Sequence, residues 1–229
     1  PVEISSSAPS AGSAGIETAT TDAFGRLRMA NPITLFDSQA QYGLSPFLWE
    51  SAVQDDATVT HLPNEAAAQL TTSTIAGSIA VRRTHQYFRY QPGKSQLILM
   101  TGVIGNPVAN NVRRVGYFDD RNGLFFEMAS TGMRTVVRSY TSGAAHDTAV
   151  AQADWNLDTM DGHGPSGVLL DFTKAQIFVI DFEWLGVGSV RFGFVVDGIT
   201  RYCHQVRNAN NITTVYMTTA NLPVRYENY

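Results

Sequence analysis

Two adjacent runs of β-forming residues constrain the fold of this chain more than any other feature. The first run predicts a strand near residues 176–185 and the second a strand near residues 188–197, with a glycine-containing turn between them. Alternate residues of a strand share one face. The large side chains expected on the shared faces are Phe178, Ile180, Phe182, Trp184, Val190, Phe192, Phe194 and Val196. Burial of each such side chain contributes roughly 1.5–3 kcal/mol, so the pair predicts the centre of a sandwich core.

Turn signals predict further strands on both sides of this pair. Asn122-Gly123 and Asp197-Gly198 favour the positive φ that tight hairpins require. The other predicted strands lie near residues 57–62, 68–74, 77–90, 95–104, 112–118, 123–129, 134–140, 199–206, 213–218 and 222–227. No long stretch shows the period of an amphipathic helix. We therefore predict an all-β fold, an antiparallel β-sandwich or jelly roll with an extended N-terminal arm.

The arm has a different composition from the rest of the chain. Residues 1–23 are mostly Ser, Ala, Thr and Gly, which cannot bury a core of their own. We expect this segment to be disordered in an isolated monomer and to become ordered on neighbouring subunits, because ordering costs about 1–2 kcal/mol per residue. Packing against its own domain is the alternative. The predicted organisation is an arm and linker over residues 1–45 and a β-sandwich domain over residues 46–229.

Apolar and aromatic residues mark the expected interaction sites. The linker is predicted to be extended, since Pro32 disfavours helical geometry at the residue before it. The candidate interaction residues are Phe24, Arg26, Leu27, Arg28, Ile33, Leu35, Phe36, Trp49 and Trp155. We expect Trp49 and Trp155 at the surface, where Trp155 beside Asp154 would be the choice for a glycan contact. Packing of Trp155 within its loop is the alternative.

Composition and charge argue against several classes of partner. Charged residues make up 16% of the chain and the formal net charge is −4, which gives no electrostatic support for nucleic-acid binding. No apolar run approaches the roughly 18–20 residues of a membrane span, and no secretory signal is visible. Cys203 is the only cysteine, so no internal disulfide can form, as expected for assembly in a reducing cytoplasm.

The residues that could carry chemistry are few. Asp181 and Glu183 lie two apart on one predicted strand face, roughly 6.5–7 Å between Cα atoms, which is within the spacing of glycosidase carboxylates. An ion pair with Arg191 is the favoured alternative. We expect Cys203 and His204 to face opposite sides of a strand, with Cys203 a small core residue. The scattered histidines show no metal-ligand spacing. We therefore predict no catalytic residue, no metal and no cofactor, so the chain is not expected to be an enzyme.

Several segments together resemble a family of tailed-phage virion proteins. They are residues 24–28 (FGRLR), 31–37 (NPITLFD), 90–96 (YQPGKSQ), 116–120 (GYFDD), 122–127 (NGLFFE), 176–198 and 221–227 (NLPVRYE). The resemblance covers the chain from about residue 24 to its end and implies a virion component. A weaker similarity, at the level of the fold alone, is to concanavalin-like and laminin-G-like sandwiches.

The expected function follows from this resemblance and from the arm. The chain is expected to be a structural component of a bacteriophage virion that is assembled in the host cytoplasm. It would stabilise the particle either as capsid cement or decoration, or as a docking protein of the tail or an appendage. The expected partners are other capsid or tail subunits and further copies of this chain, with a trimer as one candidate. The alternative is a receptor-binding module of a tail fibre or spike that recognises host-surface glycans.

Overall fold

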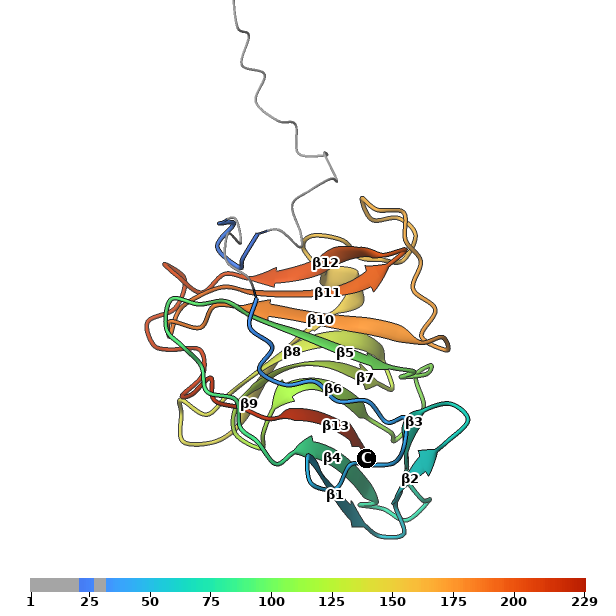
Figure 1. Cartoon of the computed structure of the whole chain (residues 1–229). Coiled ribbons are helices and arrows are strands. Elements are labelled where there is room, and N and C mark those ends of the chain that lie inside the picture. The colour runs from blue at the N-terminus through green and yellow to red at the C-terminus, as the bar shows by residue number, and fades with distance from the viewer. Residues whose placement is uncertain (1–20, 27–31) are drawn as a thin grey trace, which may run out of the picture.

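The computed structural model describes residues 21–26 and 32–229, and within them the fold is an antiparallel β-sandwich. The strands are β1 (Trp49–Gln54), β2 (Thr58–Leu62), β3 (Ala67–Thr71), β4 (Ile79–Thr84), β5 (Gln96–Gly102), β6 (Arg113–Phe118), β7 (Gly123–Ala129), β8 (Gly132–Ser139), β9 (His146–Ala151), β10 (Gln176–Phe182), β11 (Val190–Val196), β12 (Ile199–Val206) and β13 (Val224–Asn228). A seven-stranded sheet has the order β1-β4-β13-β6-β7-β8-β9, and a four-stranded sheet has the order β12-β11-β10-β5 (Figure 1). Strands β2 and β3 form a separate hairpin. No helix of the described residues is long and apolar enough to cross a membrane.

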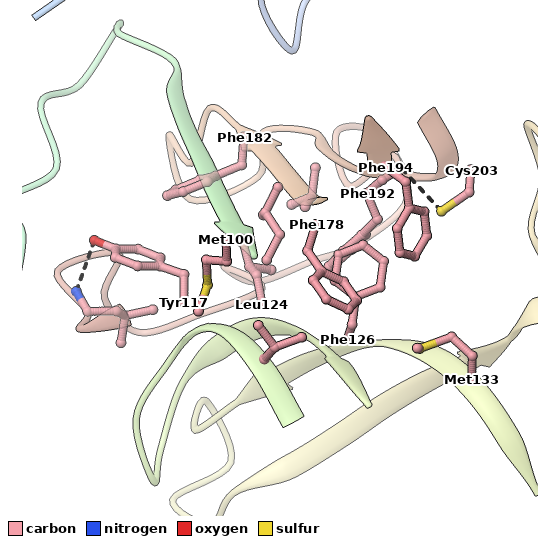
Figure 2. Packing of buried hydrophobic residues seen from close by; sticks show 14 of the residues in the cluster. Met100, Tyr117, Leu124, Phe126, Met133, Phe178, Phe182, Phe192, Phe194 and Cys203 are labelled. Carbon is pink, nitrogen blue, oxygen red and sulfur yellow. Dashed lines mark hydrogen bonds between the residues drawn. The ribbon is translucent and has the colours of Figure 1, made fainter. Parts of the chain in front are cut away.

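The main core lies between the two sheets, as the alternation in residues 176–196 predicts. Figure 2 shows Phe178, Phe192 and Phe194 of β10 and β11 gathered near Phe126 of β7. The ring of Phe126 lies 5.2 Å from that of Phe178 and 5.0 Å from that of Phe194, measured between centroids. Tyr117, which is also buried, donates its hydroxyl hydrogen bond to backbone carbonyls, including that of Phe88. Aromatic pairs at these separations add about 0.5–1.5 kcal/mol each beyond their burial.

Most of the predicted strands are present, and the differences have identifiable causes. The strands β1 and β9 were not predicted, because both are edge strands with mostly exposed residues and lack a clear apolar alternation. The prediction of a strand over residues 213–218 is wrong: this segment is irregular, although Tyr216 and Met217 are buried. Its backbone makes hydrogen bonds to side chains instead of to another strand. For example, the Thr218 backbone N–H donates a hydrogen bond to Asn122 Oδ1.

Both predicted hairpins form, but their turns differ. Asp197 and Gly198 have φ of 53° and 75°, as expected for a two-residue turn. Gly123 is instead the first residue of β7 and pairs with Phe118. Its lack of a side chain is needed for space, since a Cβ there would overlap Phe118. The turn of the β6–β7 hairpin is therefore made by residues 119–122, with Asn122 buried beneath it.

The seven-stranded sheet is wider than the four-stranded sheet, so both flanks of its inner face need another cover. On the β1–β4–β13 side the cover is the linker, residues 36–44. Phe36 packs its ring edge-on against Trp49 at 5.8 Å, and Ser38 Oγ accepts a hydrogen bond from the Trp49 indole. The Arg82 guanidinium donates to the Leu44 carbonyl. Residues 36–44 of the predicted arm and linker thus pack against their own domain.

The outer face of the seven-stranded sheet carries a network of arginines and carboxylates. Glu127 of β7 is almost fully buried and accepts hydrogen bonds from Arg114, at 2.5 Å, and from Arg134. Arg114 also stacks over the Phe125 ring at 5.3 Å. Gly116 is required opposite Phe125, because a Cβ there would overlap the Leu124 carbonyl and the Phe125 Cα and Cβ. The outer face is therefore closed by its own side chains.

The substitution Glu127→Gln tests this network. Removing one charge of a buried pair leaves the others uncompensated and costs about 3–5 kcal/mol. We expect a loss near the lower end of that range, because the Arg134 side chain is partly exposed. Glu50→Gln, whose partner is the half-exposed Arg83, should change the free energy of unfolding by less than about 1 kcal/mol. Urea denaturation followed by circular dichroism measures both, and equal losses would contradict the buried network.

Candidate functional site

A cavity opens on the flank of the seven-stranded sheet that the linker does not reach. It encloses about 490 Å³, within the range of about 300–1,000 Å³ typical of ligand sites. Its walls are the inner faces of β8 and β9, the β11–β12 pair and the segment 205–216. The lining residues are Thr135, Val137, Ser139, Thr141, Thr148, Val150, Phe192, His204, Gln205, Val206, Arg207, Asn208, Ile212, Thr214, Val215 and Tyr216. None of them is a carboxylate.

Two lining hydroxyls are buried and make no hydrogen bond. Thr135 is 2% exposed and Tyr216 is 7% exposed. Neither Thr135 Oγ1 nor Tyr216 Oη has a partner in the described part of the chain. Burial raises the pKa of Tyr216, so its hydroxyl stays neutral and keeps its proton. An unpaired buried hydroxyl costs about 1–3 kcal/mol, and neither oxygen is accessible to solvent from the cavity.

His204 reaches the cavity because of an irregularity in β12. The pairing of β11 with β12 shifts between Phe192 and Gly193, which leaves Cys203 as an extra residue. Cys203 lies in the main core and His204 lines the cavity. The prediction that these two face opposite sides is therefore wrong, since a bulge turns successive residues the same way. That Cys203 is a buried core residue is confirmed.

The protonation state of His204 follows from its surroundings. Burial lowers the pKa of the imidazole, which is therefore neutral at pH 7. Its Nδ1 accepts a hydrogen bond from the Asn156 amide at 3.3 Å. The proton of the neutral ring then sits on Nε2. His204, one of the lining residues, thus carries a single N–H donor on its ring.

The predicted carboxylate pair forms a second, different site on the outer face of the four-stranded sheet. Asp181 is fully buried and accepts hydrogen bonds from Ser95, Arg191 and Tyr202. The favoured alternative, an ion pair between Asp181 and Arg191, is confirmed at 2.6 Å. Glu183 is fully buried as well. Because both carboxylates are covered, neither is open to a substrate in this structure.

The cover over Glu183 is the short arm segment 21–26. Arg26 donates to Glu183 at 2.5 Å and to Asp22 at 2.6 Å. Ser189 donates to the Ala23 carbonyl, and Arg191 donates to the Thr21 carbonyl. These contacts fix the end of the described arm on the outer face of the sheet. Figure 1 shows this segment in blue beside β10, β11 and β12.

The two predicted surface tryptophans are buried. Trp49 is 8% exposed beneath the linker and Trp155 is 4% exposed. The Trp155 indole donates to the Val150 carbonyl, and its ring lies 6.2 Å from that of Phe194. The prediction of exposed aromatics is therefore wrong at both positions, and loop packing of Trp155 is confirmed. Trp155 belongs to the main core, and Trp49 packs against Phe36 of the linker.

The remaining candidate residues of the arm and linker divide into packed and exposed side chains. Phe36 packs inward, whereas Ile33 is 77% exposed and Leu35 is 52% exposed. Tyr42 and Phe47, which were not predicted as interaction residues, are 91% and 95% exposed. Phe24 is also partly exposed, beneath the Arg26 guanidinium. Leu27 and Arg28 lie outside the described residues, as do residues 1–20 of the predicted arm.

Sequence reasoning missed the cavity entirely. Thr135, His204 and Tyr216 come from three segments that are far apart in the chain. Threonine and tyrosine are common strand residues, so neither type signals a site. Only the closing of the sandwich brings them together.

Comparisons with known proteins give a distant likeness in fold. No family model matches the sequence, and neither does any curated protein. The chain is similar to a β-glucanase of Bacillus licheniformis, with 12% identity, 83% of each chain covered and a TM-score of 0.47. It is also similar to the binding domain of botulinum neurotoxin DC in complex with SialylT, with 8% identity, 80% of this chain and 41% of that chain covered, and a TM-score of 0.40. Likeness at this level transfers no function.

The arm contact gives a pH-dependent prediction. Burial raises the pKa of Glu183, and Asp22 adds to this against the opposing effect of Arg26. A carboxyl group with a raised pKa contributes stability when protonated, and loses that contribution as pH rises through the folded-state value. Wild-type protein should therefore gain stability from Glu183 as pH falls from 7 towards about 4.3, the ordinary glutamate value. Glu183→Gln should lack this gain.

Unfolding free energies of both proteins across this range measure the effect. Glu50 serves as the control, because its hydrogen bond with Arg83 lowers the pKa of its carboxyl. Its contribution therefore has the opposite sign and is lost as pH falls. Parallel pH profiles for wild type and Glu183→Gln would contradict the assignment.

Proposed function

We propose that this chain is a non-catalytic structural component of a bacteriophage particle, and that it makes subunit contacts through its arm and linker. The observation that carries this proposal is the set of exposed apolar side chains on the linker and the residues that flank it, Ile33, Leu35, Tyr42 and Phe47. Such side chains are costly to leave in water, and groups of them are typical of protein interfaces. The partners are neighbouring capsid or tail subunits, including copies of this chain.

The linker is suited to such contacts because its two sides differ. Phe36, Ser38 and the Leu44 carbonyl hold one side against the inner face of the seven-stranded sheet. Neighbouring side chains, among them Leu35, point away from it. The backbone of the linker is thus already in place, so a partner loses less entropy in binding it than in binding a free segment.

The arm segment 21–26 supports the same proposal from another direction. The ion pair between Arg26 and Glu183 fixes this segment on the sandwich. Residues 1–20 have the polar composition of a tether. Contacts between them and neighbouring subunits would make the stability of this chain depend on the presence of those subunits. The proposed location is the virion, with assembly in the host cytoplasm.

Replacing Tyr42 and Phe47 with Ser tests the linker contact. Both side chains are exposed, so the double variant should keep the unfolding temperature of the wild type and lose incorporation into particles. Particles purified from host cells that express the variant during infection would be assayed by quantitative mass spectrometry. Phe36→Ser is the matched control and should instead lower the unfolding temperature, because Phe36 packs against Trp49 and Phe88.

Deletion of residues 1–23 tests the arm in the same assay. We expect a folded sandwich that no longer joins particles. Unimpaired incorporation of both the truncation and the Tyr42/Phe47 variant would overturn the structural role.

Recognition of host-surface glycans by a tail fibre or spike module is the second candidate function. The observation that favours it is the open cavity beside β8 and β9, whose wall combines hydroxyl, amide and apolar groups without carboxylates. Binding of the full chain to a glycan array tests it. Failure to bind any glycan would exclude this function and leave the structural role untouched.

A further inference from the structure

We propose that the outer face of β5 and β10 is a docking site for residues 16–20 of the same chain, with Ile16 packed against Leu97 and Leu99. This inference goes beyond the proposed function, because it concerns a contact within one chain and leaves residues 1–15 for neighbouring subunits. The receiving face belongs to the described part of the chain, whereas residues 16–20 lie outside it.

The receiving surface is an apolar strip on β5, an edge strand of the four-stranded sheet. Ile98 and Met100 of this strand pack into the main core. Alternate side chains of a strand point to opposite faces, so Leu97 and Leu99 point outward, where they are 43% and 57% exposed. No residue of β5 is charged, and native proteins usually protect an edge strand with charges, a bulge or a covering segment. The strip therefore favours a covering segment.

The arm segment 21–26 brings the chain onto the same face. Ser189, just before β11, donates a hydrogen bond to the Ala23 carbonyl. Arg191, two residues further along, donates one to the Thr21 carbonyl. Followed towards its N-terminus, the chain thus runs along the line of β11. The arm contacts therefore direct the preceding residues along the outer face of the four-stranded sheet.

Ile16 can reach the strip from this anchor. Strand pairing places Leu97 in one row with Arg191, two strands away. Leu99 is two residues further along β5, so it lies about 12 Å from the position of Arg191 by strand rise and strand spacing. Ile16 precedes Thr21 by five positions, and an extended backbone of that length spans about 17 Å. The intervening residues are therefore long enough for the contact, with little excess.

The sequence of the docked segment suits an apolar sheet surface. Residues 16–20 read IETAT, and isoleucine and threonine favour strands. With period two, the isoleucine and both threonines would share one face, and Glu17 would point to the other, towards water. Residues 5–15, by contrast, contain only Ser, Ala, Gly and Pro. Ile16 is therefore the large apolar side chain that lies near enough to the anchor to cover the strip.

Cleavage of the full chain by endoproteinase Glu-C, which cuts after glutamate, tests the contact. Glu17 lies within the docked segment, and Glu3 lies in the same arm outside it. The double variant Leu97→Ser, Leu99→Ser should increase the rate of cleavage after Glu17 by about tenfold, because cleavage follows the population of the released segment. The rate of cleavage after Glu3 should be the same in both proteins. Mass spectrometry of the released peptides measures both rates in one sample.

Val53→Ser is the matched control, because Val53 is 54% exposed and lies on β1, an edge strand of the other sheet. It should leave cleavage after Glu17 unchanged. Leu99→Ser alone, at the more exposed position of the strip, should change the Glu17 rate in the same direction as the double variant. This single variant keeps the experiment decisive if circular dichroism shows that the double variant has lost its fold.

Protein concentration distinguishes a contact within one chain from a contact between copies. Protection of Glu17 should be independent of concentration. Protection that increases with concentration would assign the strip to the arm of a second copy and overturn the intrachain contact. Equal Glu17 rates in wild type and the Leu99→Ser variant would overturn the docking site itself. These measurements use the isolated protein, so their failure leaves the proposed role in particles to its own test.

Discussion

The difference in width between the two sheets is the constraint on which the rest of the structure depends. The four-stranded sheet covers only the middle of the seven-stranded sheet, so the inner faces of β1–β4 and of β8–β9 would otherwise be open to water. An open apolar sheet face is unstable, and the chain covers the two flanks with different segments. On one flank the linker packs tightly over Trp49, and on the other the segment after β12 closes incompletely and leaves a cavity.

These two covers give the molecule its candidate functions. A segment that packs one side against the sheet exposes its other side to solvent. Tyr42 and Phe47 are therefore exposed, whereas Phe36 is partly buried against the core. An incomplete cover, by contrast, leaves buried polar groups such as Thr135 Oγ1 without partners. The first is the surface that we propose for macromolecular contact, and the second is the cavity on which the alternative function rests. Both can exist in one protein because they lie on opposite flanks.

The carboxylates show how strongly context decides a residue's role. Asp181 and Glu183 have the spacing of a catalytic pair in the sequence, yet Arg191, Tyr202 and the arm bury both in ion pairs and hydrogen bonds. The cross-strand partner Arg191 was predictable because strand pairing places it opposite Asp181. The ion pair between Arg26 and Glu183 was not predictable, because 157 residues separate the two in the sequence.

The sequence by itself determined the all-β class, the central β10–β11 pair and the Asp197-Gly198 turn, because these depend on alternation and backbone preferences that act over a few residues. It did not reveal the edge strands β1 and β9, whose pairing is imposed by neighbours rather than by their own pattern. Only the tertiary structure decided that Trp49 and Trp155 are covered, that a bulge turns His204 inward and that Thr135 and Tyr216 share a cavity. The physical reason is that burial and hydrogen-bond satisfaction are set by segments distant in sequence, and local residue patterns carry no information about which of them will meet.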